Sequence, residues 1–278
     1  MRGKPVHAPE RSIACIPEAD AAAGKKGTVT ASRNEYRNFL KDSIRLTIDF
    51  NQTDQSKGIA PPPLQKPCAA DSQRISLIPP HDWRGISPID LVSAIENRRS
   101  HRQFTREQLN RDELSFLLWA TQGIRSRAGG STAFRTVPSA GCRHALETYL
   151  CILNVTELAP GVYRYLPLEH QLAVVSQEKD LSQRVIAATL QQSFIGKAAA
   201  VFVWTTIPYR MEWRYDVASA KVIALDAGHV CQNLYLACAA IGSGTCAVAA
   251  YHQGLMDELL GIDGDSEFTL YLAPVGKI

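Results

Sequence analysis

Helix-type and strand-type apolar patterns alternate along the chain from residue 87 onward, and this alternation limits the fold more than any other feature. Helical spacing of apolar residues marks 87–95, 109–120, 181–192 and 219–241. Segments rich in β-branched and aromatic residues, bounded by turn formers, predict strands at 146–155, 161–165, 198–207 and 268–275. The first two strands are expected to be neighbours in one sheet. No internal repeat of about 20 to 50 residues is present, which excludes solenoids and propellers.

Local signals predict where two of these helices begin and end. Ser87 followed by Pro88 is typical of an N-cap and a first helical position. The helix over 109–120 ends at Gly123, and its apolar face, which carries Leu114 and Leu117, is expected to be buried.

The N-terminal part of the chain has a different character. Residues 1–32 mix charge, alanine, glycine and proline without periodicity, which predicts a flexible leader. Tyr36, Phe39 and Leu40 have helical spacing after Ser32 as N-cap, which predicts a short helix. The proline-rich stretch 58–80 predicts an extended connector. We therefore expect a leader (1–32), a helix with a Pro-rich connector (33–80) and a main domain (81–278).

Composition narrows the class of protein. With 45% hydrophobic and 21% charged residues the chain is of ordinary globular type. The net charge of +3 is small and scattered, so neither nucleic acid nor a membrane surface is expected as partner. Seven cysteines without CxxC spacing predict neither disulfides nor a metal site. No apolar run approaches the roughly 20 residues of a membrane span and no signal peptide is evident, so a cytoplasmic location is expected.

The most informative polar cluster is Arg98-Arg99-Ser100-His101-Arg102, at the end of the helix that starts near Ser87. Forked guanidinium donors and a serine hydroxyl suit a phosphate monoester. The alternative is a solvated basic helix end, which interacts favourably with the helix dipole.

Two segments of small residues would let a backbone approach a flat ligand closely. The first is Thr136 to Gly141, and its alternative is a plain turn. The second, Gly242 to Ala250, has glycines that follow a helix rather than a strand, so it is not a dinucleotide fingerprint. Its alternative is helix termination followed by a short strand.

Taken in order, these segments resemble SagB-type dehydrogenases of the nitroreductase family. The resemblance covers about residues 81–278, and the matching motifs are Arg98 to Arg102, Leu117 to Ala120, Pro138 to Gly141, Gly161 to Tyr165, Ala227 to His229, Gln232 to Leu234, Gly242 to Cys246 and Tyr271 to Gly276.

The resemblance implies an α+β fold, a mixed central sheet packed by helices, and a homodimer with FMN at its interface. Arg98, Ser100 and Arg102 would hold the FMN phosphate, with Arg99 adjacent. The facing subunit would supply the loop Pro138, Ser139, Ala140 and Gly141. Backbone N–H groups of Ala247, Val248, Ala249 and Ala250 would lie along the isoalloxazine ring. The reaction would be ping-pong hydride transfer through flavin N5, with NAD(P)H as candidate donor and a small molecule or a peptide as substrate.

One departure from the family pattern bears on the substrate. Azoline-oxidising members carry a Lys-Tyr pair before the long helix, and this sequence has Arg214-Tyr215 there. Arginine stays protonated and cannot act as the base. Arg214 and Tyr215 are the candidate catalytic residues, but azoline oxidation is less expected than general reductase activity.

Other tempting residues have structural explanations. His229 and Gln232 on the long helix are expected to be satisfied core groups. Cys246 is expected to be a small buried hydrophobe, and Tyr163 and Tyr165 packing residues. Two further hypotheses stay open: a non-catalytic flavin-binding or scaffold component of a peptide-modification complex, and a protein that binds no flavin because the arginine cluster is only surface charge.

Overall fold

A computed structural model describes residues 33–129 and 132–278, so the predicted leader lies outside the described residues. Its α-helices are α1 (Arg33–Leu40), α2 (Leu91–Asn97), α3 (Arg111–Gln122), α4 (Leu181–Ala188), α5 (Tyr209–Tyr215), α6 (Ser219–Ala239) and α7 (Gln253–Leu260). Its strands are β1 (Arg74–Ser76), β2 (Ile124–Arg127), β3 (Ala133–Arg135), β4 (Leu146–Ile152), β5 (Gly161–Leu166), β6 (Gln171–Gln177), β7 (Ala200–Thr206), β8 (Ser243–Thr245) and β9 (Phe268–Lys277). Short 3-10 helices are η1 (Ser43–Thr47), η2 (Phe50–Gln52), η3 (Ala140–Cys142), η4 (Ile195–Lys197) and η5 (Asp216–Ala218).

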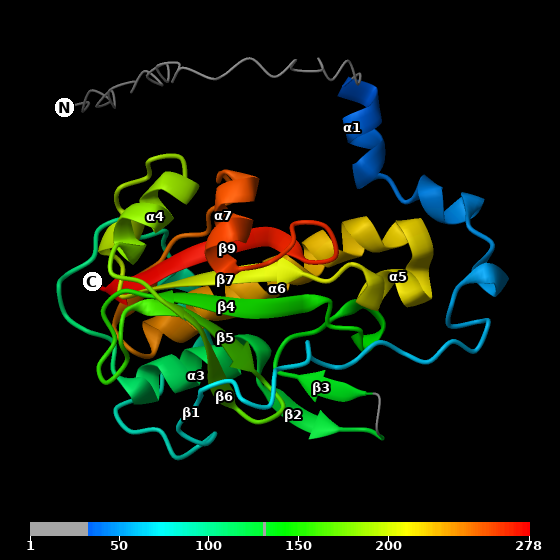
Figure 1. Cartoon of the computed structure of the whole chain (residues 1–278). Helices are drawn as coiled ribbons and strands as arrows, with labels where there is room; N and C mark the ends of the chain where they lie inside the picture. The colour runs from blue at the N-terminus through cyan, green and yellow to red at the C-terminus, as the bar shows by residue number, and fades with distance from the viewer. Residues whose placement is uncertain (1–32, 130–131) are drawn as a thin grey trace, which may run out of the picture.

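A seven-stranded sheet with the order β1-β6-β5-β4-β7-β9-β8 forms the centre of the molecule (Figure 1). All pairs between its named strands are antiparallel. Parallel pairing in the described residues is limited to isolated bridges, one of which joins Ser100 to Thr245. The α+β class is confirmed, but the expectation of a mixed sheet is corrected to an antiparallel sheet, because β4, β5 and β6 follow one another through short turns rather than crossover helices.

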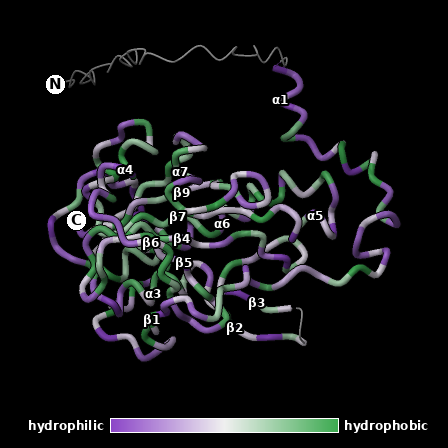
Figure 2. Tube along the Cα trace, viewed as in Figure 1, coloured by the Kyte–Doolittle hydropathy of each residue, from purple (hydrophilic) through white to green (hydrophobic). Residues whose placement is uncertain are grey.

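Helices cover both faces of the sheet, and alternation along the strands builds a core on each face. On β7, Phe202 and Trp204 belong to the core under α3 and α6, whereas Val201 and Val203 belong to the core under α4 and α7. Figure 2 shows apolar residues concentrated along these central strands and a largely hydrophilic α1. The predicted burial of Leu114, Leu117 and Leu118 on α3 is confirmed.

Most expected elements are present with shifted ends. The predicted strands correspond to β4, β5, β7 and β9, and β4 and β5 pair as expected. The predicted helices correspond to α1, α2, α3, α4 and α6. The stretch 58–80 contains no helix, as predicted, but it contributes the edge strand β1. The segment after Gly242 forms β8, so the interpretation as helix termination followed by a short strand is confirmed there.

The predicted start of α2 is wrong. Asp90, not Ser87, is the N-cap, because its carboxylate accepts a hydrogen bond from the Ser93 N–H at 2.9 Å. The Ser87 N–H instead donates to the carbonyl of Ala240 at the end of α6.

Among the described residues, no helix is both long and apolar enough to cross a membrane.

Candidate functional site

The arginine cluster follows α2 and runs beside β8. Ser100 forms a parallel bridge with Thr245, and the His101 N–H donates to the Thr245 carbonyl at 2.9 Å. A Cβ added at Gly244 would come within 2.6 Å of the His101 side chain, so glycine is required where the two segments meet. The structure therefore brings together two candidate segments that lie about 150 positions apart.

Tyr235 on α6 connects these two segments. Its hydroxyl lies 2.9 Å from Ser100 Oγ and accepts a hydrogen bond from the Ala247 N–H at 2.8 Å. The Arg98 guanidinium lies over its ring, 5.3 Å from the centroid. Sequence reasoning missed Tyr235, because a tyrosine on a mostly apolar helix gives no signal of a polar role.

The guanidinium groups of this cluster have no carboxylate partner among the residues that the structure describes. The ion pairs found in the described part of the chain involve other cations, and Arg98, Arg99 and Arg102 are all exposed. A surface hollow of about 590 Å³ opens beside Arg102, lined by Ser100 to Thr105 and Ile278. The cluster is thus an uncompensated cationic site with room for an anion next to it.

The segment Ala247 to Ala250 lies beside this cluster and offers fewer free donors than expected. The Ala247 N–H is bonded to Tyr235, and the Val248 N–H donates to the Leu272 carbonyl at 2.8 Å. The Val248 side chain is buried in the core, while Ala249 and Ala250 are exposed. Only the last two N–H groups have no acceptor among the described residues.

Cys246 is buried between these groups, as expected of a small hydrophobe. Burial raises the pKa of its thiol, while Arg102 and Ser100 act in the opposite direction. The raised pKa keeps the thiol protonated at neutral pH and argues against a role as nucleophile.

The loop from Pro138 to Gly141 lies at the other end of α6. The Ala140 N–H faces the Asp226 carboxylate at 3.2 and 3.3 Å, and burial raises the pKa of that carboxyl. Asp226 precedes Tyr235 by nine positions, about 13 Å along a helix. Within one chain, this loop is therefore separate from the arginine cluster.

The same loop packs on Arg214 and Tyr215. A Cβ added at Gly141 (φ +56°) would come within 2.5 Å of the Tyr215 hydroxyl and 2.9 Å of Arg214 Cδ. The Arg214 guanidinium lies 5.6 Å from the centroid of the Tyr215 ring. The structure thus joins the loop and the candidate catalytic pair, which the sequence offered as separate segments.

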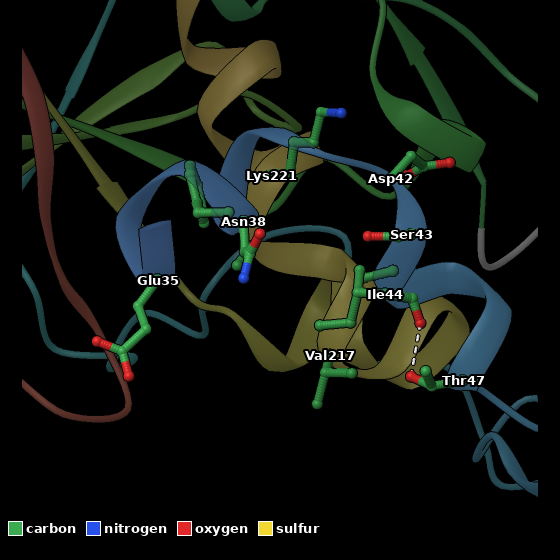
Figure 3. A pocket seen from close by; sticks show the side chains of 11 residues that line it. Glu35, Asn38, Asp42, Ser43, Ile44, Thr47, Val217 and Lys221 are labelled. Atoms are coloured by element: carbon green, nitrogen blue, oxygen red, sulfur yellow. Dashed lines mark hydrogen bonds between the residues drawn. The ribbon is translucent and has the colours of Figure 1, made fainter. Parts of the chain in front are cut away.

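A hollow of about 520 Å³ opens next to this pair, between α1 with η1 on one side and the start of α6 on the other. Figure 3 shows Asp42 and Ile44 from the N-terminal segment opposite Val217 and Lys221. Val217 follows Tyr215 by two positions, but neither Arg214 nor Tyr215 lines the hollow.

Two expectations for α6 are wrong and two for β5 are confirmed. His229 and Gln232 are exposed rather than satisfied in the core, because they lie on the face of α6 that points away from the sheet. Tyr163 and Tyr165 are buried packing residues, as predicted. In the described part of the chain no group of three His, Cys, Asp or Glu side chains could hold a metal ion.

An antiparallel sheet covered by helices on both faces, with the arginine cluster beside its β8 edge, makes this an α+β protein. The family model described as "Nitroreductase family" matches residues 95–277. The chain belongs to the nitroreductase family, as the sequence motifs predicted.

Two named relatives support this assignment. The Methanocaldococcus jannaschii protein MJ1384, named as a nitroreductase, is 33% identical over 192 residues, which cover 69% of this chain and 93% of that protein. The trifolitoxin-processing protein TfxB of Rhizobium leguminosarum bv. trifolii is 24% identical over 250 residues, which cover 84% of this chain and 65% of TfxB. The second likeness is in keeping with the SagB-type branch.

Solved structures show the same fold. A nitroreductase-type protein of Ralstonia eutropha JMP134 has a TM-score of 0.61 at 24% identity, over 76% of this chain and 91% of the other. The Escherichia coli microcin synthetase McbBCD complex with truncated pro-MccB17 bound contains a chain with a TM-score of 0.55 at 19% identity, over 91% and 99% of the two chains. An FMN complex from Exiguobacterium sibiricum 255-15 has a TM-score of 0.50 at 13% identity, over 69% and 89%.

Proposed function

We propose that this protein is an FMN-dependent oxidoreductase that passes hydride between two substrates in turn. The observation that carries the proposal is the set Arg98, Arg99, Ser100 and Arg102, in which three arginines without carboxylate partners in the described residues adjoin a serine hydroxyl in the chain. Such a set suits a dianionic phosphate monoester. The FMN bound in the Exiguobacterium sibiricum relative supports the choice of this phosphate ester.

The surroundings of the cluster also suit a flavin. The hollow beside Arg102 has room for a phosphate, and the N–H groups of the exposed residues Ala249 and Ala250, which have no acceptor among the described residues, can donate to a ring edge. Bound FMN would supply the hydride chemistry, by accepting and donating hydride at its N5 position. In this role Arg98 and Arg102 bind the phosphate, while Tyr235 fixes Ser100 and Ala247 relative to each other.

We further propose that the active unit is a homodimer. The apolar residues Leu91, Val92 and Ile95 of α2 are exposed, and so is Leu225 on α6. An exposed apolar face of this kind is typical of an interface between subunits. Pairing through it would bring Pro138 to Gly141 of one subunit, with Arg214 and Tyr215, toward the arginine cluster of the other.

Within that dimer, Arg214 and Tyr215 are the proposed substrate-side residues. Arg214 remains a cation at neutral pH, so it orients an anionic group rather than removing a proton. The Tyr215 hydroxyl, placed against Gly141, is the group that can donate a proton to a substrate. This division favours reduction of an acceptor over base-catalysed oxidation of an azoline.

The visible spectrum of the purified protein tests the proposal, together with chromatography of the released flavin and stopped-flow reduction by NADH and NADPH. Flavin bands, FMN on release and reoxidation by a nitroaromatic or quinone acceptor are expected. Flavin that can be reduced but that no acceptor reoxidises enzymatically would favour the scaffold role, a role supported by similarity to peptide-processing proteins. A protein that cannot be loaded with FMN would contradict both.

Changing Val92 to glutamate is expected to break the dimer and release the flavin together. Val92 is 73% exposed in the single chain, and burying an unpaired carboxylate at an apolar interface costs several kcal/mol. We expect at least a hundredfold weaker dimerisation by analytical ultracentrifugation. Val175→Glu, on the exposed side of β6, is the matched control and should leave the dimer intact. A Val92→Glu protein that stays dimeric and yellow would rule out this interface.

Changing Tyr235 to phenylalanine is expected to weaken FMN binding about tenfold without unfolding the protein. The change removes two hydrogen bonds, each worth about 0.5–1.5 kcal/mol, and frees Ser100 to rotate. Fluorescence titration with FMN measures the effect. Tyr163→Phe loses a hydroxyl that donates to Ala159 instead, so it should leave FMN affinity unchanged. Equal losses in both variants would mean that Tyr235 acts only through stability.

A further inference from the structure

Arginines gather around the loop that follows β3. Arg135, Arg143 and Arg210 are all buried, and Arg214 is half-buried. Of these four, only Arg210 forms an ion pair with a described residue, with Glu147 at 2.6 Å. Glu147 also faces Arg164 at 3.7 Å, so this one carboxylate already serves two cations.

Arg143 is the least compensated member of this group. Arg143 is 8% exposed, and its Nε has no hydrogen-bond partner within the described structure. The guanidinium lies 4.8 Å from the centroid of the Trp213 ring. No carboxylate in the described parts of the chain lies within ion-pair distance of it.

Two contacts place Arg214 near Arg143. Arg214 follows Trp213, on which Arg143 is stacked, and its side chain packs against Gly141, two positions before Arg143. Burial lowers the pKa of Arg143, and the positive charge of Arg214 lowers it further. Asp226 of α6, the carboxylate that contacts this loop, is occupied by the Ala140 N–H and the Ser139 hydroxyl.

Two neighbouring guanidinium groups without a counter-anion are unfavourable, because burial of an unpaired charge costs several kcal/mol and like charges repel. The backbone around Arg143 is strained, because Cys142 and His144, on either side of it, have φ values of +57° and +48°. Strain of this kind is found where a site must be held in one geometry. The arrangement is thus built to receive an anion from outside the chain.

We propose that Arg143 and Arg214 together bind the carboxylate of the substrate. Two forked donors match the two oxygens of a carboxylate. The Tyr215 hydroxyl lies beside Gly141, next to the Arg214 side chain. That the bound acid is the substrate rests on the proposed function, whereas the carboxylate site itself does not. The carboxylate can belong to a small free acid or to a peptide.

Calorimetric titration of the purified protein with benzoate and with benzamide, its neutral counterpart, tests the site without any flavin reaction. We expect benzoate to bind at least tenfold more tightly than benzamide to the wild type, and the ratio to fall to about one in Arg143→Gln and in Arg214→Gln. Arg74→Gln, an exposed arginine on the edge strand β1, should keep the wild-type ratio. N-acetyl-glycyl-phenylalanine and its amide distinguish a peptide source from a free acid. Equal binding of benzoate and benzamide to the wild type would overturn the proposal.

A second measurement separates binding from structure. If Arg143 is held unpaired for a ligand, Arg143→Met should raise the melting temperature of the ligand-free protein, because it removes a buried charge and keeps an unbranched side chain on Trp213. If Arg143 only stacks on Trp213, the same change should lower it, which would overturn the proposal. With FMN-loaded enzyme, the wild type should prefer 4-nitrobenzoate over 4-nitrobenzamide in kcat/KM by about tenfold. Benzoate binding without FMN loading would contradict the proposed function alone.

Discussion

Replacing Arg98 and Arg102 together with alanine is expected to raise the dissociation constant of FMN by roughly three orders of magnitude. A hydrogen bond between charged groups contributes about 1.5–3 kcal/mol, and the two guanidinium groups would each lose at least one to the phosphate. Both side chains are exposed and form no ion pair in the described structure, so their loss should not unfold the protein. The purified variant should be colourless, with a melting temperature close to that of the wild type without FMN.

Arg106→Ala is the matched control for this double variant. Arg106 is exposed, follows Arg102 by four positions and also forms no ion pair in the described structure, but it lines a different hollow, beside Lys179 and Lys197. It should keep the wild-type affinity for FMN. If the double variant binds FMN as tightly as Arg106→Ala does, the arginine cluster is only surface charge and the phosphate lies elsewhere.

The sequence predicted the elements of the fold well where one physical signal dominated. The run from Ala198 to Ile207 is almost wholly apolar, and it forms the central strand β7. By contrast, β6 and α5 were not predicted, since Gln171–Gln177 and Tyr209–Tyr215 mix polar and apolar residues at no clear period. The position of β6 depends on pairing with β5 across a short turn, and that of α5 on the ion pair of Arg210 with the distant Glu147.

The candidate site was predictable in its composition but not in its connections. The guanidinium groups of Arg98 to Arg102 could be recognised as a cluster in the sequence, because they lie within five consecutive positions. Tyr235 was not, since its importance lies in two contacts made across 135 and 12 positions of chain. The exposure of Val92 was equally hidden, because a helical apolar pattern does not tell whether the same chain or a second copy covers it.

Replacing Glu147 with glutamine is expected to lower the free energy of unfolding by about 3–5 kcal/mol. Glu147 is 2% exposed on β4, and its carboxylate pairs with Arg210 of α5 and Arg164 of β5. Removing one charge of a buried pair leaves the other unpaired, and the measured cost of such changes is in this range. The Lys66 N–H, which donates to Glu147 at 2.8 Å, keeps an acceptor in glutamine. Urea unfolding followed by circular dichroism measures the loss.

Glu157→Gln is the control, because Glu157 pairs with Arg111 at the exposed surface and should contribute little. A further variant separates charge from shape: Glu147→Gln combined with Arg210→Met removes both members of the closest pair, and it should recover part of the lost stability. A Glu147→Gln protein as stable as Glu157→Gln would mean that the buried arginines need no carboxylate. Arg210 is three positions before Trp213 on α5, and the Arg143 guanidinium lies over the Trp213 ring. If the Glu147–Arg210 pair also holds Arg143 and Arg214 in place, benzoate binding should weaken together with stability in Glu147→Gln.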